Sequence, residues 1–210
     1  MSLADQLRAA LSAPATERPL EGDSPELRAK ADIAAAVLIA ITDRSEPGAI
    51  LTVRREHMRT HAGQIAFPGG RVDSDEDPTQ AALREANEEL LLDPGSVELV
   101  GSIEPYRTVT GYIVTPVIGV IPADLPLTPH EYEVADWFEA SLAFLLDPLN
   151  HNYRSALFQG QTRHYYEIVW NGRRIWGATA AMIVNLSRRL QWSRSSTPPN
   201  GANGAEQHAC

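Results

Sequence analysis

Three glutamates, Glu85, Glu88 and Glu89, lie close together in this chain and could act on phosphate. At about 100° per residue on a helix, their side chains fall within roughly 100° of arc, while Leu83 and Leu90 point to another side. Neighbouring carboxylates repel one another unless protons or a hard divalent cation offset their charge. Mg²⁺ takes few protein carboxylates and completes its shell with water and phosphate oxygens, so the pattern favours metal-dependent phosphate chemistry. The alternative is a solvated acidic face.

The helix that carries these acids has a predicted start at Pro78. Asp77 can accept hydrogen bonds from the first backbone N–H groups, and Gln80 can reach back to close a capping box. Proline fits the first helical position because its missing N–H is not needed there. Arg84 stands one turn before Glu88, so an ion pair between them can orient that carboxylate.

Charge is unevenly distributed along the sequence. The formal net charge is −9 at pH 7, and residues 73–93 alone hold eight acids and one base. This excess of acid argues against broad binding to nucleic acid or to an anionic membrane. A basic segment lies immediately before the acidic one, and its arginines are Arg54, Arg55, Arg59 and Arg71.

The length of 210 residues and the 43% hydrophobic content predict one globular domain with a substantial core. No apolar run is long enough to span a membrane, and the first thirty positions lack a basic start followed by an apolar stretch. The only cysteine is Cys210, which excludes an internal disulfide and fits a reducing compartment. We therefore expect a cytoplasmic protein.

The pattern of apolar residues predicts the elements that position these groups. An amphipathic helix at 3–11 and a loose lead-in form residues 1–30, a mixed domain spans 31–192, and 193–210 is expected to be a disordered tail. Strands are predicted at 33–41, 49–55, 97–104 and 111–121, with a hairpin at 153–159 and 163–170 and a closing helix at 175–190. Hairpins together with helices indicate an α/β (α+β) protein with a mixed sheet.

The acidic segment resembles a known motif. Gly70, then Glu76, then Arg84-Glu85-Ala86-Asn87-Glu88-Glu89 matches the Nudix box, G-x5-E-x7-R-E-U-x-E-E-x-G-U, where U is apolar. Leu91 stands where the box has glycine, which takes the left-handed conformation that ends a helix at low cost. We therefore expect the helix to run slightly further and to end before Pro94.

A second resemblance lies upstream. Residues 50–55, Ile-Leu-Thr-Val-Arg-Arg, and residues 63–70, Gly-Gln-Ile-Ala-Phe-Pro-Gly-Gly, are similar to the L-L-T-x-R-S…G-x3-F-P-G-G signature of the coenzyme A pyrophosphatase branch of Nudix hydrolases. Arg55 replaces the serine of that signature, and Ile50 replaces its first leucine. The similarity to this branch extends over about residues 33–190.

The resemblance implies an α-β-α sandwich around a mixed β-sheet and a role for each residue of the motif. Glu85, Glu88 and Glu89, with Gly70 close by, would hold Mg²⁺ or Mn²⁺, which would polarise a phosphoryl oxygen and activate water. Glu76 and Arg84 are expected to pair and to brace the loop and helix. The general base would be Glu85 or an acid from a later loop, with Glu104, Glu131 and Glu133 left open.

The implied reaction is hydrolysis of the diphosphate of coenzyme A, or of a derivative, to 3′,5′-ADP and 4′-phosphopantetheine. The alternatives are a Nudix hydrolase of ADP-ribose, NADH or a dinucleoside polyphosphate, and a catalytically silent Nudix-fold binding module. Arg54, Arg59 and Arg71 could bind the substrate's phosphates, or could be solvated surface residues. The expected partner is therefore a small nucleotide, not nucleic acid or membrane, with a homodimer left open. Trp137, Trp170 and Trp176 are expected in the core.

Overall fold

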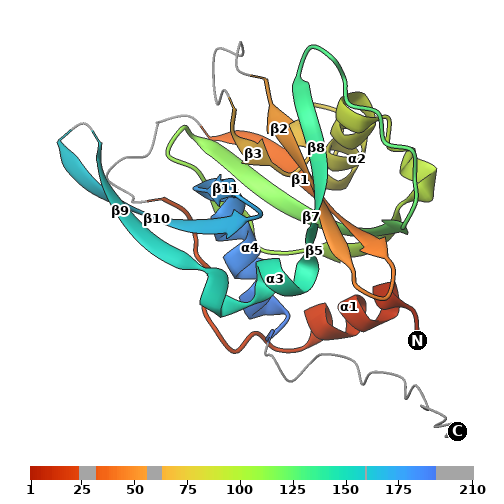
Figure 1. The fold of residues 1–210 in the computed structure, drawn as a ribbon, viewed down its shortest axis with the longest axis horizontal. Coiled ribbons are helices and arrows are strands. Elements are labelled where there is room, and N and C mark those ends of the chain that lie inside the picture. The colour runs from red at the N-terminus through yellow and green to blue at the C-terminus, as the bar shows by residue number, and fades with distance from the viewer. Residues whose placement is uncertain (24–31, 56–62, 159, 193–210) are drawn as a thin grey trace, which may run out of the picture.

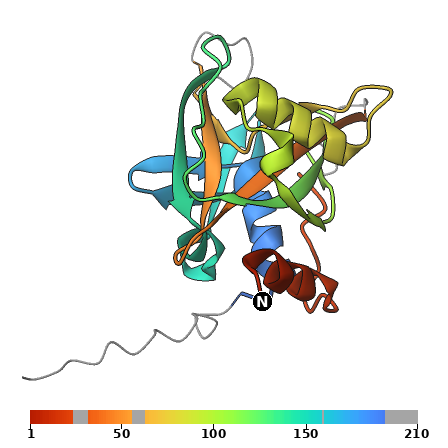
Figure 2. The same cartoon turned by 90° about the vertical axis from the view of Figure 1, so that its right-hand side faces the viewer.

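A mixed β-sheet with helices on both faces forms the centre of the protein (Figures 1 and 2). The computed structural model describes residues 1–23, 32–55, 63–158 and 160–192. The central sheet is ordered β3-β2-β1-β7-β5, while β4 pairs with β1, β6 with β7 and β8 with β2. Its strands are β1 (Ile33–Asp43), β2 (Gly48–Arg54), β3 (Ile65–Ala66), β4 (Gly69–Arg71), β5 (Glu98–Ser102), β6 (Tyr106–Arg107), β7 (Tyr112–Pro122) and β8 (Val134–Ser141).

A second sheet of three strands, β11-β10-β9, stands beside the first. Its strands are β9 (Asn152–Phe158), β10 (Gln161–Trp170) and β11 (Arg173–Trp176), and all pair antiparallel. The helices are α1 (Leu3–Ser12), α2 (Pro78–Leu90), α3 (Leu142–Leu146) and α4 (Ala178–Arg189), with short 3₁₀ turns η2 (Pro94–Ser96) and η3 (Pro148–Asn150). No helix in the described part of the chain is long and apolar enough to cross a bilayer.

Strand β1 is buried on both faces, which explains its almost continuous apolar sequence. Side chains alternate along it, so Leu38 packs in the core beneath α2, while Ile39 packs in the larger core on the opposite face. That larger core includes residues of α1, α3 and α4. The layers are therefore helix, sheet and helix, as the expected α-β-α sandwich requires.

Most predicted elements are confirmed, while the start of the closing helix and the placement of Trp176 are corrected. The N-terminal helix, the hairpin of β1 and β2, strands β5 and β7, and the hairpin of β9 and β10 all lie where the sequence predicts them. The closing helix begins at Ala178 instead of Ile175, because Ile175 and Trp176 complete β11 against β10. Trp176 is 37% exposed, so its expected place in the core is wrong. Trp137 and Trp170 are half-buried against the two cores.

Two expectations lie outside the described residues. These are the disordered tail at 193–210 and the phosphate-binding role of Arg59.

Candidate active site

Helix α2 begins as the sequence predicts. The Asp77 side chain accepts hydrogen bonds from the backbone N–H groups of Thr79 and Gln80, at 2.7 and 2.9 Å. The Gln80 side chain accepts one from the Asp77 N–H at 2.8 Å, which closes the capping box. The start of the helix is therefore fixed by local contacts, and it sets the direction in which each glutamate points.

The end of α2 differs from the expectation. The helix stops at Leu90, and Leu91 itself takes the left-handed conformation, with φ 53° and ψ 28°. Its N–H donates to the Asn87 carbonyl at 2.8 Å, and its side chain is exposed. The next residue, Leu92, is buried and accepts a hydrogen bond from the Asn87 side chain, which fixes the turn despite the steric cost at Leu91. The prediction that the helix would continue toward Pro94 is wrong.

Gly70 lies against Glu85, the first of the three glutamates. Strand β4 pairs with β1 through Ala36↔Gly70, and this pairing brings the Gly70 backbone alongside α2. A Cβ atom at Gly70 would lie 2.2 Å from Oε1 of Glu85, far inside van der Waals contact. Glycine at this position therefore lets the backbone approach the Glu85 carboxylate closely.

The three glutamates are not equally exposed. The Glu88 side chain is 58% exposed, that of Glu85 is 16% exposed and that of Glu89 is only 5% exposed. The solvated acidic face that the sequence leaves open as an alternative therefore does not include Glu89. Glu89 lies on the side of the helix that the 100° spacing predicts. Strands β2 and β4 and the segment before β8 cover that side.

Arg84 links most of the acids at this site. It contacts Glu76 at 2.8 Å, Glu85 at 3.0 Å and Glu88 at 3.1 Å, and it donates to the Arg71 carbonyl at 3.0 Å. The ion pairs expected from Arg84 to Glu76 and to Glu88 are both present. The pKa of Glu76 is lowered because Arg84 and the Asp73 N–H stabilise its charged form.

Glu89 is the acid with the most strongly perturbed titration. Burial raises its pKa to about 8, although Arg54 opposes the shift with a guanidinium 3.8 Å away. Its Oε2 atom is buried and has no hydrogen-bond partner. Leaving a buried carboxylate oxygen without a hydrogen-bond partner costs free energy of folding. The Oε2 atom is therefore a candidate to contact a bound ligand or ion.

Glu133 is the later acid that the fold brings to this helix. Its backbone carbonyl accepts a hydrogen bond from the Arg55 N–H at 3.1 Å, directly before β8 pairs with the end of β2. Its charge raises the pKa of both Glu85 and Glu89, although burial is the larger cause for each. Sequence reasoning could not choose Glu133 over Glu104 and Glu131, because the choice depends on how β2 and β8 pair.

The predicted arginines lie at different parts of the site. Arg54 ends β2 beside Glu89, and its Nε atom is buried without a hydrogen-bond partner. Arg71 ends β4, where its guanidinium donates to the Tyr112 hydroxyl at 3.1 Å and lies 5.7 Å from the centre of that ring. Between Arg54 and Arg71, it is therefore Arg54 that the structure places directly against an α2 glutamate.

The carboxylate oxygens of the α2 glutamates are chemically suitable ligands for a divalent cation. Glu89 offers an unpartnered oxygen, and the close approach of Gly70 to Glu85 leaves no room for a side chain between them. As the side chains lie, Arg84 holds Glu85 and Glu88, and no three acids or histidines of the described residues converge to hold a metal ion. A cation here must therefore compete with Arg84 for the Glu85 carboxylate.

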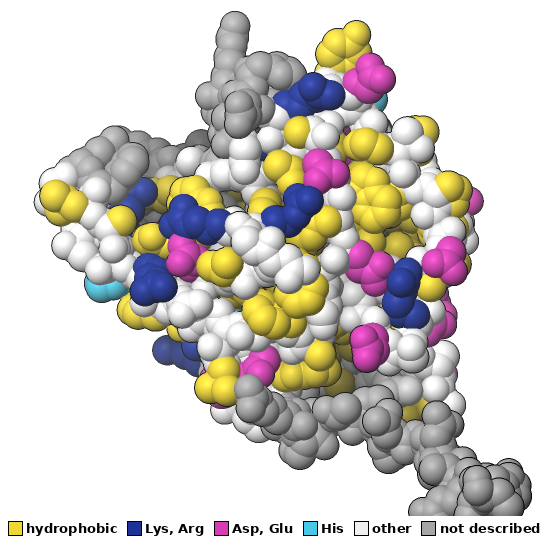
Figure 3. All heavy atoms as spheres, in the orientation of Figure 1, with side chains coloured by type: hydrophobic (Ala, Val, Ile, Leu, Met, Phe, Trp, Pro, Cys, Tyr) yellow, Lys and Arg dark blue, Asp and Glu magenta, His cyan; other side chains and the backbone are white. Residues whose placement is uncertain are grey.

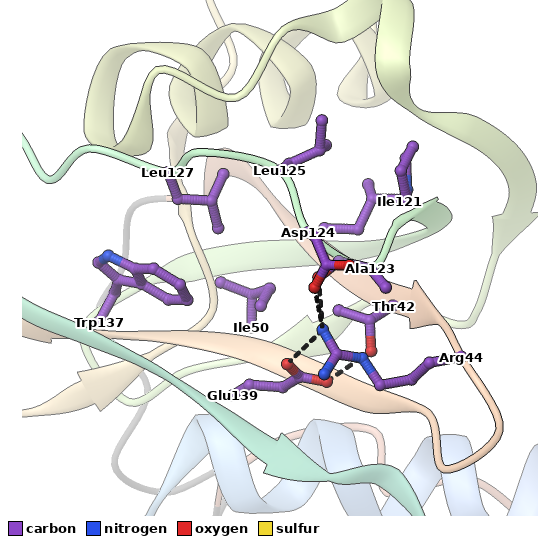
Figure 4. Close-up of a pocket in the computed structure, with 11 residues that line it drawn as sticks. Thr42, Arg44, Ile50, Ile121, Ala123, Asp124, Leu125, Leu127, Trp137 and Glu139 are labelled. Carbon is purple, nitrogen blue, oxygen red and sulfur yellow. Dashed lines mark hydrogen bonds and ion pairs between the residues drawn. The ribbon is translucent and has the colours of Figure 1, made fainter.

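A cavity of about 250 Å³ lies on the α2 side of the sheet, away from these acids (Figure 4). Its wall combines apolar side chains such as Ile50 and Trp137 with Arg44, which pairs with Glu139 at 3.2 Å. None of the α2 glutamates lines it, so the cavity is distinct from the acid site.

Comparison with known proteins defines the class of this chain. The model of the NUDIX domain matches residues 32–159, and a hydrolase from Escherichia fergusonii, described as uncharacterized Nudix hydrolase NudL, is 44% identical over 157 residues. That match covers 74% of this chain and 82% of the relative. A NudL from Shigella boydii serotype 4 is 45% identical over 158 residues, with the same coverage. The chain belongs to the Nudix family.

The chain is also similar to solved structures of Nudix proteins. The binary complex of a Caenorhabditis elegans Ap4A hydrolase has a TM-score of 0.44 at 20% identity, covering 52% of this chain and 80% of that chain. The NUDIX domain of Shewanella oneidensis NrtR complexed with ADP ribose has a TM-score of 0.42 at 20% identity, covering 59% and 80%. As a family member, the chain is a pyrophosphohydrolase of nucleoside diphosphate derivatives, and Nudix hydrolases generally use divalent ions such as Mg²⁺ or Mn²⁺.

Proposed function

We propose that this enzyme hydrolyses the diphosphate of coenzyme A, or of a coenzyme A derivative, to 3′,5′-ADP and 4′-phosphopantetheine. The observation that carries the proposal is the upstream signature, which supplies Arg54 beside Glu89 and Gly70 beside Glu85. We further infer a cytoplasmic enzyme whose partner is a small nucleotide.

In this proposal Glu85, Glu88 and Glu89 hold Mg²⁺ or Mn²⁺ next to Gly70. Bound there, the ion would supply positive charge that polarises the diphosphate and makes a water easier to deprotonate. Arg84 supplies the counter-charge that pairs with Glu85 and Glu88. Glu76 supports this arrangement, because its pair with Arg84 fixes the guanidinium from the loop side.

The chain's own residues supply the remaining chemistry. A water oxygen forms a bond to one phosphorus, the bond from that phosphorus to the bridging oxygen breaks, and each product keeps one of the two phosphates of the diphosphate. A carboxylate must take the proton of the attacking water, and we assign this role to Glu85 or to Glu133, whose charge contributes to raising the pKa of Glu85. Arg54 and Arg71, with Arg59, would bind the phosphate oxygens, for which a guanidinium provides paired donors.

Two alternatives each have an observation in their favour. Arg55 departs from the coenzyme A signature, which favours a Nudix hydrolase of another nucleoside diphosphate derivative. The hold of Arg84 on Glu85 and Glu88 favours a silent binding module, because it occupies two of the three expected ligands. Both alternatives predict that coenzyme A is not cleaved.

The test is to incubate the purified protein with coenzyme A and Mg²⁺ or Mn²⁺ and to separate the products by chromatography. We expect 3′,5′-ADP and 4′-phosphopantetheine in equal amounts. Glu85→Gln and Glu89→Gln should each lower kcat by at least about 100-fold, while Glu98→Gln, a matched change on an exposed strand residue, should leave it unchanged. Cleavage of ADP-ribose, NADH or a dinucleoside polyphosphate in place of coenzyme A would refute the substrate assignment, and binding without turnover would support the silent module.

A further inference from the structure

The three-stranded sheet has one face that no other described element covers. Side chains alternate across it, and Ile168 and Ile175 point inward and are fully buried. Their neighbours point outward, where Val169 is 46% exposed and Trp176 is 37% exposed. We call this outer surface the β10–β11 platform, and its residues are Arg154, Tyr165, Glu167, Val169, Arg174 and Trp176.

Two arginines of the platform are held by one carboxylate. Glu167 pairs with the Nε atom of Arg174 in a short contact and with the Nε atom of Arg154 at 3.4 Å. The Glu167 side chain is only 13% exposed, whereas the two arginine side chains are 55% and 49% exposed. Since both contacts use Nε, terminal N–H groups of the two guanidiniums remain available to an anion. The pKa of Glu167 is lowered, mainly by Arg174, so its carboxylate stays charged.

The same cluster includes two aromatic rings. The Arg174 guanidinium lies 5.0 Å from the centre of the Trp176 ring and 5.8 Å from that of Tyr165. The two rings meet edge to face, with centroids 5.9 Å apart, and the Tyr165 hydroxyl accepts a hydrogen bond from Arg174 at 3.0 Å. A fixed, partly exposed indole beside a guanidinium is well suited to stack on a nucleobase.

The platform is joined to the candidate active site through β3. Strand β11 packs against β3, and Thr179 at the start of α4 donates to the Ile65 carbonyl of β3 at 3.1 Å. Strand β3 in turn pairs with β2, which ends at Arg54 beside Glu89. Strand β3 therefore links the strand that carries Arg174 and Trp176 to the strand that ends at Arg54.

The positive charge around the β10–β11 platform contrasts with the net negative charge of the whole protein. Arginine side chains gather over β9, β10 and β11 (Figure 3), in a protein whose net charge is −9. Arg173 extends the basic surface toward β8, where it pairs with Asp136 at 2.9 Å and covers the Phe138 ring at 4.3 Å. The surface thus combines positive charge with aromatic rings, next to a site rich in acids.

We propose that the β10–β11 platform binds the nucleotide half of the substrate, with the base stacked on Trp176 and a phosphate carried by the ribose bound to Arg174 and Arg154. This inference rests on the proposed function, because coenzyme A carries such a phosphate outside the diphosphate that is cleaved. A small nucleotide fits better than a nucleic acid, since a long polyanion would also meet the excess of acid around α2.

The test distinguishes the contribution of the base to substrate binding from that of the ribose phosphate. Steady-state kinetics are measured on coenzyme A and on dephospho-coenzyme A, which lacks the 3′-phosphate. Arg174→Ala should raise KM for coenzyme A by at least 10-fold and leave KM for dephospho-coenzyme A within 2-fold. Trp176→Leu should raise both KM values, and neither change should alter kcat by more than about 3-fold, because these residues do not touch the reacting atoms. Arg18→Ala, at an 88% exposed side chain near the N-terminus, is the matched control and should change nothing.

Binding of 3′,5′-ADP in the presence of EDTA provides a second readout that does not depend on turnover. We expect calorimetry to show binding to the wild type and a loss of at least 10-fold in both platform variants, with circular dichroism confirming that they are folded. If coenzyme A is cleaved and neither variant changes KM or binding, the platform proposal is wrong and the proposed function stands. If coenzyme A is not cleaved, both fail. Tighter binding of a single-stranded oligonucleotide than of 3′,5′-ADP, lost in the same variants, would assign the surface to nucleic acid instead.

Discussion

Glu89 is expected to destabilise the metal-free protein, and Glu89→Gln should relieve that cost. The carboxyl group has a pKa of about 8 in the folded chain, against an ordinary value of 4.5. Between these two values the unfolded chain releases a proton that the folded chain retains, so unfolding becomes easier as pH rises. At pH 7 the difference spans about 2.5 pH units above 4.5, and at about 1.36 kcal/mol per unit this gives an upper limit of about 3 kcal/mol.

Urea unfolding in EDTA, followed by tryptophan fluorescence, measures this effect. Glu89→Gln should be more stable than the wild type by up to about 3 kcal/mol at pH 7 and by less than about 1 kcal/mol at pH 5, because pH 5 lies only about 0.5 unit above the ordinary pKa of the unfolded carboxyl group. Glu88→Gln is the control, since its side chain is 58% exposed and should change stability by less than about 0.5 kcal/mol.

The reasoning would be refuted if Glu89→Gln were less stable than the wild type at pH 7, or if the difference did not grow between pH 5 and pH 7. Addition of Mg²⁺ or Mn²⁺ should stabilise the wild type more than Glu89→Gln, because a cation that binds only the folded state stabilises it more the lower its Kd, and the variant lacks one of the proposed ligands.

Further predictions concern two glycines of β4, the left-handed residue at the end of α2 and the protonation of His151. Gly70→Ala should cost less than about 1 kcal/mol, because its Cβ meets only the flexible end of Glu85, yet it should lower kcat by at least about 10-fold by displacing that carboxylate. Gly69→Ala should instead lower stability by more than about 2 kcal/mol, since its Cβ would lie 2.3 Å from the backbone carbonyl of Ala36; thermal unfolding and kinetics on both variants decide this. Leu91→Gly should raise stability by about 1 kcal/mol in urea unfolding, and a loss would show that the exposed Leu91 side chain makes a contact that offsets its left-handed backbone. In a Glu89→Gln background, which removes the opposing effect of that carboxyl group, lowering the pH from 7 to 5.5 should destabilise the fold through His151, because burial lowers its pKa and the unfolded chain therefore takes up the proton first; His151→Asn in the same background should reduce the difference between the two pH values.

The parts of the site that depend on local chemistry were predictable from the sequence. The capping box at Asp77 and the one-turn spacing of Arg84 and Glu88 are set by residues close in the chain, and both have the expected geometry. The burial of Glu89 was not predictable, because a helical wheel gives all three acids similar positions while β2, β4 and the segment before β8 come from elsewhere.

The missed elements have the same cause. Strands β3 and β4 have two and three residues, too few for an alternating pattern, and they form because β2 and β1 provide pairing partners. Ile175 and Trp176 read as the start of a helix because their apolar character suits either structure, and the register against Glu167 and Ile168 makes them a strand. At Leu91 the burial of the next leucine outweighs the preference for glycine at a helix end.

The central claim is that the glutamates of α2 hold a divalent cation, and Mn²⁺ binding followed by electron paramagnetic resonance tests it directly. The wild type should remove the signal of free Mn²⁺, and Glu85→Gln and Glu89→Gln should each weaken binding by at least 10-fold, with Glu98→Gln unchanged. Equal binding by all four proteins, or no binding by the wild type in the presence of coenzyme A, would contradict the account.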